Sequence, residues 1–144
     1  MVNNKLNAYQ QVSNQSAQFA DPHRLIQMLM DGFIMRVAAA RGAMQRREFE
    51  RKGVELGKAI SILSGLRDTL DHDKGGELAA NLEGLYDYMQ RRILEATASN
   101  DVAMLDEIIG LMREVKTGWD GIRDAATGAA EVKAADPNGV SVSG

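Results

Sequence analysis

The 144-residue chain contains no cysteine and only two histidines. The lack of cysteine excludes disulfide bonds, thiolate metal ligands and thiol nucleophiles. Neither histidine has a glutamate three residues before it, so the Glu-x-x-His pattern of di-iron helical bundles is missing. We therefore expect no metal ion, no cofactor and no enzymatic activity.

Long apolar runs are missing as well. No stretch approaches the roughly 20 apolar residues that a membrane-spanning helix needs, and the N-terminal sequence lacks the apolar core of an export signal. Acidic residues outnumber basic ones by 20 to 17, which gives a net charge of −3. Such a protein lacks the basic surface with which a general nucleic-acid binder displaces counterions. We expect a cytoplasmic protein that neither inserts into membranes nor binds nucleic acid.

Aromatic residues make up 5% of the chain and there are two prolines, but apolar residues recur at helical spacing in four segments. Asp21 followed by Pro22 is typical of a helix start. The expected helices cover residues 21–47, 49–71 and 76–97, with a fourth that begins after Asn100 or Asp101. Because short joints connect antiparallel neighbours, this pattern predicts an all-α, antiparallel up-down four-helix bundle.

The two ends of the chain differ from its middle. Leu6, Tyr9 and Val12 are spaced by three residues in a polar N-terminal segment, which places them on one helical face. The C-terminal residues are small and polar with no period, and we expect them to be disordered. The predicted organisation is an N-terminal docking segment at 1–20, a bundle domain at 21–125 and a disordered tail at 126–144.

The sequence DHDKGG resembles the start of a calcium-binding loop. Asp71, Asp73 and Gly76 match its first, third and sixth positions, but Gly75 stands at the fifth position and Leu82 at the twelfth, where ligands are required. The two glycines do not complete a phosphate-binding loop either. We predict a tight turn in which one of the two glycines adopts a positive φ.

A basic cluster lies around the joint between the first two expected helices. Its cations are interleaved with three glutamates, which favours a solvated turn with salt-bridged flanks. The alternative is a helical DNA-associated or regulatory module that works through this joint. The cluster comprises Arg41, Arg46, Arg47, Arg51, Lys52 and Lys58, with Glu48, Glu50 and Glu55.

Some apolar residues lie off the core stripes of the expected helices. On a helical wheel Met28 and Met35 fall outside the stripe of the first helix. An uncovered apolar strip is typical of a protein-binding groove, and flexible methionine side chains suit irregular partners. A wider core, singly exposed residues and an oligomer interface are the alternatives. The predicted binding residues are Met28, Met35, Ile62, Tyr88, Met104 and Leu111.

Several segments resemble the flagellar secretion chaperone FliS family over about residues 6–122. They are NAYQQV, DPHRLIQMLMDG, LGKAISIL and LDHDKGGELAANLEGLYDYMQRRI, followed by Asn-Asp and an apolar helix with Trp119 near its end. The resemblance implies a cytoplasmic chaperone that binds the disordered C-terminal region of flagellin, blocks premature polymerisation and delivers it to the type III export gate, a membrane protein. It implies that Leu6, Tyr9 and Val12 contact that gate or cover the client groove. We expect a monomer or a weak dimer.

Overall fold

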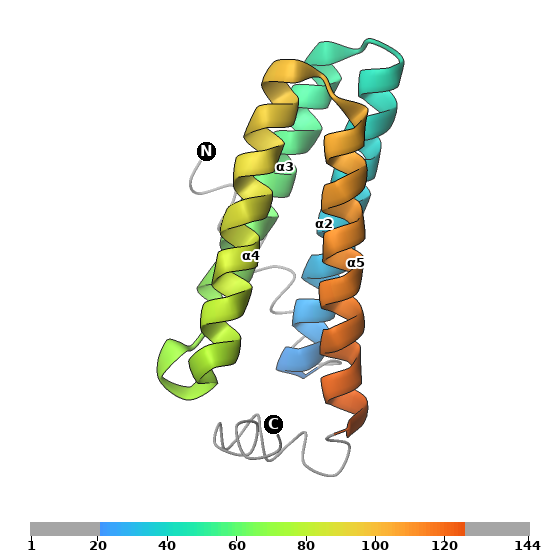
Figure 1. Cartoon of the computed structure of the whole chain (residues 1–144). Helices are drawn as coiled ribbons and strands as arrows, with labels where there is room; N and C mark the ends of the chain where they lie inside the picture. The colour runs from blue at the N-terminus through green and yellow to red at the C-terminus, as the bar shows by residue number, and fades with distance from the viewer. Residues whose placement is uncertain (1–20, 126–144) are drawn as a thin grey trace.

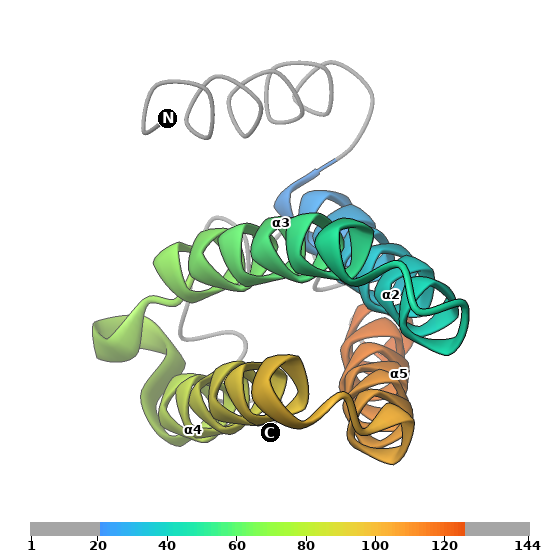
Figure 2. The same ribbon diagram turned by 90° about the horizontal axis from the view of Figure 1, so that it is seen from above.

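The computed structural model describes residues 21–125, and their side chains as far as residue 122. This part of the chain forms the helices α2 (Pro22–Gln45), α3 (Phe49–Asp68), α4 (His72–Ser99) and α5 (Val102–Ala125). Each helix runs antiparallel to the next, and α5 closes the ring against α2 (Figure 1). Seen from above, the four helices surround one axis in the order of the chain (Figure 2). The antiparallel four-helix bundle expected from the sequence is confirmed.

Short polar side chains begin and end the helices. The Asp21 carboxylate accepts a hydrogen bond of 2.9 Å from a backbone N–H in the first turn of α2, and Pro22 is the first helical residue. Asn100 ends α4 in the left-handed conformation, with a φ of 55°. The Asp101 carboxylate then accepts a hydrogen bond of 2.9 Å from the Ala103 backbone N–H at the start of α5. These ends keep the joints short, so consecutive helices must lie side by side. None of the four helices is long and apolar enough to cross a membrane.

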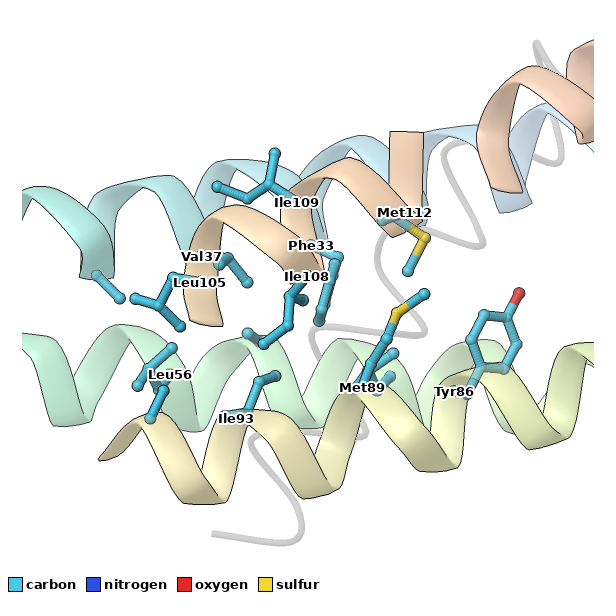
Figure 3. Packing of buried hydrophobic residues seen from close by; sticks show 14 of the residues in the cluster. Phe33, Val37, Leu56, Tyr86, Met89, Ile93, Leu105, Ile108, Ile109 and Met112 are labelled. Atoms are coloured by element: carbon cyan, nitrogen blue, oxygen red, sulfur yellow. The ribbon is translucent and has the colours of Figure 1, made fainter. Parts of the chain in front are cut away.

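The core lies along the axis of the bundle, and all four apolar stripes contribute to it. Figure 3 shows labelled side chains from all four helices packed together in the interior. Full burial of each large apolar side chain contributes about 1.5–3 kcal/mol to the free energy of unfolding. The largest fully buried side chains are Tyr86, Phe33, Met30, Leu56, Leu63, Leu66, Met89, Ile93, Leu105, Ile108, Met112 and Val37.

Lys52 is buried, although the sequence pattern placed it in a solvated turn. Only 5% of its surface is exposed. Its ammonium group donates a hydrogen bond of 2.9 Å to the Thr97 backbone carbonyl and another to the Asn100 side chain. The last carbonyls of a helix have no partner within the helix and carry partial negative charge. The expectation for Lys52 was therefore wrong, because its cation stabilises the end of α4.

Glu55 is the second buried charge of α3, and it faces α2. Its carboxylate lies 3.1 Å from a nitrogen of Arg36 and 3.4 Å from a nitrogen of Arg51. Burial alone would raise the pKa of Glu55, but the hydrogen bond and charge of Arg36, with the charges of Lys58 and Arg51, hold this pKa below its usual value. The carboxylate therefore stays ionised at neutral pH and links α3 to α2.

A kink near the start of α4 contains the positive φ that the sequence predicts. Gly76 has φ 52° and ψ −127°, which breaks the regular helix. His72 to Gly75 form one helical turn ahead of this kink, so α4 begins four residues earlier than expected. At Gly75 an added Cβ would lie 2.9 Å from the Cβ of Ala79, so this position also requires glycine. The two glycines turn the chain.

The conformation of Gly76 leads to a prediction about stability. Gly76→Ala should lower the free energy of unfolding by about 1–2 kcal/mol, because residues with a Cβ rarely adopt this conformation. No atom lies within 4 Å of the added Cβ, so the effect is conformational and not steric. Urea unfolding followed by circular dichroism measures it. The matched control is Gly84→Ala, at an equally open helical position, which should raise stability by about 0.5–1 kcal/mol. Equal effects at both positions would contradict the prediction.

Candidate protein-binding site

An apolar strip runs along the outer face of α2 and reaches α3. Met35 is 70% exposed and Met28 is 36% exposed. These two residues are seven apart, so they share a face and lie about 10 Å apart along the helix axis. Gly32 lies between them, and a Cβ added there would be 3.6 Å from Cδ1 of Ile62. We call Met28, Gly32, Met35 and Ile62 the outer α2 strip.

A second set of predicted residues lies where α4 meets α5. Met104 and Leu111 are two turns apart on α5, and both are partly buried against the core. Tyr88 of α4 donates a hydrogen bond of 2.6 Å from its hydroxyl to Glu107, which lies between them on α5. The Met104 sulfur lies 3.8 Å from the Ser99 hydroxyl, which donates its proton to the Glu95 backbone carbonyl at 2.9 Å. We call Tyr88, Met104 and Leu111 the α4–α5 strip.

The α4–α5 strip contains a fixed polar network. Arg92 Nε donates a hydrogen bond of 3.0 Å to the same Glu107 carboxylate that accepts from Tyr88. The hydrogen bond from Tyr88 has the largest effect on the pKa of the Glu107 carboxyl, and it lowers this pKa. Desolvation by burial would raise the pKa, but the hydrogen bond and charge of Arg92 lower it further, so the net shift is downward. The hydrogen bond between Tyr88 and Glu107 also raises the pKa of the Tyr88 hydroxyl. Tyr88 is therefore neutral at physiological pH, and its hydroxyl is already hydrogen-bonded to Glu107.

The structure groups the six predicted residues into two strips. The helices form a ring in chain order, so the side formed by α2 and α3 is opposite the side formed by α4 and α5 (Figure 2). The structure brings Met28, Met35 and Ile62 to the first side. Their role in binding stays a prediction, as does that of the three residues of the α4–α5 strip. A single extended partner can contact both strips only by passing around the bundle.

Among the residues that the structure describes, three further large apolar side chains are exposed that were not among the predicted binding residues. They are Phe49 and Val54 on α3 and Leu94 on α4. Leu94 directly follows the buried Ile93, so it points well away from the core stripe of its helix. The wheel argument that selected Met28 would have found Leu94 as well. Two cations lie over the Phe49 ring, with Arg47 Cζ 5.4 Å and Lys52 Nζ 5.3 Å from the ring centre.

The basic joint is largely neutralised by carboxylates. Arg46 lies 3.2 Å from Glu48, Arg51 pairs with Glu55, and Arg41 pairs with Asp106 of α5. These cations stabilise contacts within the bundle, which weakens the DNA-associated alternative. Within residues 21–125, no three histidine, aspartate or glutamate side chains gather in a way that could hold a metal ion. Leu6, Tyr9 and Val12, together with the predicted tail, lie outside the described residues.

Exposed large apolar side chains on a packed helical bundle are typical of proteins that bind other polypeptides. The sequence profile described as "Flagellar protein FliS" matches residues 5–126. The chain is 56% identical to the flagellar secretion chaperone FliSB of Pseudomonas aeruginosa, over 79% of this chain and 91% of the relative. It is 44% identical to the flagellar secretion chaperone FliS of Vibrio cholerae, over 81% of this chain and 87% of the relative. It is 43% identical to the corresponding chaperone of Salmonella typhimurium, over 85% of this chain and 92% of the relative.

The chain belongs to the FliS family. It is a flagellar secretion chaperone and not an enzyme. Its sequence resemblance to that family is confirmed.

Proposed function

We propose that this chaperone binds the disordered C-terminal region of flagellin in the cytoplasm, prevents its premature polymerisation and delivers it to the export gate. The observation that carries the proposal is the exposure of Met35, at 70%, on the outer face of a packed bundle. Most of the surface of this large apolar side chain is not covered by the described part of the chain. It gains favourable burial only when a partner covers it.

The mode of binding follows from the shape of the two strips. Amphipathic segments of an unfolded client can lie as helices along the outer α2 strip and the α4–α5 strip. Each Å² of apolar surface removed from water contributes about 25 cal/mol, which must exceed the entropy that the client loses on ordering. Two strips that bind one chain also raise its effective concentration at each strip after the first has bound. Moderate contacts on each side therefore add up to stable binding.

The N-terminal segment keeps the role that the family resemblance implies. Leu6, Tyr9 and Val12 contact the export gate, or they cover a client strip while no client is bound. Both roles use the three apolar residues that their spacing predicts to share one helical face. This part of the proposal is drawn from the sequence alone.

Calorimetric titration of the chaperone with a peptide from the C-terminal region of flagellin tests the function. We expect one peptide to bind one chaperone with a negative heat-capacity change, and the peptide to gain helix by circular dichroism. A peptide of equal length and charge with the apolar residues in scrambled order is the control. Absence of binding, or equal binding of the scrambled peptide, would refute the proposal. Size-exclusion chromatography with and without client measures the oligomeric state, expected to be a monomer or a weak dimer.

A further inference from the structure

Met35 has the most accessible side chain among the described methionines. It is 70% exposed, whereas its neighbour on the outer α2 strip, Met28, is 36% exposed. The remaining methionines of residues 21–125 are covered to different degrees: Met30, Met89 and Met112 are fully buried, Met44 is buried, and Met104 is partly buried. An oxidant in solution therefore reaches the Met35 side chain before it reaches those of the core.

Peroxides that enter the solution have no cysteine to react with in this chain, so an exposed methionine thioether is a favoured target. Cysteine thiolates are usually the first side chains to react with peroxides, and the chain has none. When a peroxide reacts with methionine, a sulfur lone pair attacks one peroxide oxygen and the O–O bond breaks. The sulfur becomes a sulfoxide, and the other oxygen leaves as water for hydrogen peroxide or as an alcohol for an organic peroxide. The sulfur loses two electrons and the peroxide gains them.

We propose that Met35 is a redox modification site, and that its oxidation to the sulfoxide weakens the hold of the outer α2 strip on the client. This inference rests on the proposed function. Met28, Gly32 and Ile62, the other members of the outer α2 strip, have no side-chain hydrogen-bond donor for a sulfoxide oxygen. A client that covers the strip must then remove a polar oxygen from water without a replacement partner from these residues, which disfavours binding.

The modification is reversible by known chemistry. Methionine sulfoxide reductases return the thioether at the expense of two thiols, which become a disulfide while the oxygen leaves as water. The sulfoxide lies on an exposed helix face, so a reductase can reach it without unfolding the bundle. Client binding then responds to the balance between peroxide and thiol reductant.

The first arm of the experiment locates the oxidised atom. The full chain is treated briefly with hydrogen peroxide, catalase removes the excess, and trypsin releases one peptide, Leu25 to Arg36, that contains Met28, Met30 and Met35. Tandem mass spectrometry assigns the added oxygen within this peptide. We expect Met35 to react first and Met30 last. Oxidation of Met30 as fast as Met35 would overturn the inference.

The second arm measures binding of an unoxidised flagellin C-terminal peptide before and after the treatment. We expect about a tenfold loss of affinity, which a methionine sulfoxide reductase with dithiothreitol restores. The Met35→Leu variant is compared with itself before and after peroxide, and this ratio should stay near one whatever its starting affinity. An equal loss in this variant, or unchanged affinity once Met35 is oxidised, would overturn the inference alone. Failure of the untreated chaperone to bind the peptide would instead overturn the proposed function.

Discussion

Replacing Met28 and Met35 together with glutamate is expected to weaken binding of the flagellin C-terminal region by about a hundredfold, or about 2.7 kcal/mol. Full burial of a methionine side chain contributes roughly 1.5–3 kcal/mol, and a carboxylate in the same place resists removal from water. Calorimetry with the client peptide measures the change. Both side chains lie on the outer face of α2, and glutamate forms helices about as well as methionine, so the fold should be retained.

The matched control for this double variant is Leu94→Glu. Leu94 is 54% exposed on α4 and lies outside both strips. This substitution adds one carboxylate where the double variant adds two, at a position whose exposure lies between those of Met28 and Met35, and it should leave client affinity nearly unchanged. If Leu94→Glu weakened binding as much as the double variant, the client would use the side of the bundle between α3 and α4. If the double variant bound normally, Met28 and Met35 would not belong to the site.

Phe33→Ala is expected to lower the free energy of unfolding by about 3–5 kcal/mol. The Phe33 side chain has no exposed surface and belongs to the same core cluster as Ile108 and Met89, from two other helices. Removing the ring takes away its apolar burial and leaves a cavity that side chains on stiff helices fill only in part. Urea unfolding monitored by circular dichroism gives the value. Because a domain of this size is stabilised by about 5–15 kcal/mol, the loss is a large share of the total.

The control for Phe33 is the same substitution at an exposed phenylalanine. Phe49 is 40% exposed at the start of α3. Phe49→Ala should cost about 1 kcal/mol or less, mainly through lost contacts with neighbouring cations. Similar losses at both positions would show that the interior of the bundle is loosely packed. A loose interior would also leave the two strips without fixed positions.

The helices and the core follow directly from the sequence, because a helix repeats every 3.6 residues and its apolar stripe can be read locally. Helix ends were less well defined. The third expected helix was placed from residue 76, but α4 begins at His72, since one turn forms before the kink at Gly76. A positive φ at one of the two adjacent glycines was predictable from the sequence, but not that it would be at Gly76. Whether one more turn formed ahead of it depended on local hydrogen bonds that the pattern does not show.

Features that depend on contacts between helices could not be predicted. Lys52 was expected to be solvated, because its neighbours in sequence are charged, and only the approach of the α4 end explains its burial. A helical wheel shows where a residue lies on its own helix, but not how the helices are arranged around the bundle axis. The wheel therefore selected Met35 and Leu111 together, although they lie on opposite sides of the bundle. The hydrogen bond between Tyr88 and Glu107 joins two helices and could not be predicted from the wheel either.

The placement of the two strips on opposite sides has a kinetic consequence for any client that occupies both. Such a client cannot dissociate in a single step, because one half stays tethered while the other detaches. The detached half returns quickly, since its effective concentration near the empty strip is on the order of millimolar. Spontaneous loss is therefore slow. A receptor that binds the detached half prevents it from rebinding to the chaperone. The client can then dissociate from the second strip and be transferred without ever being free in solution.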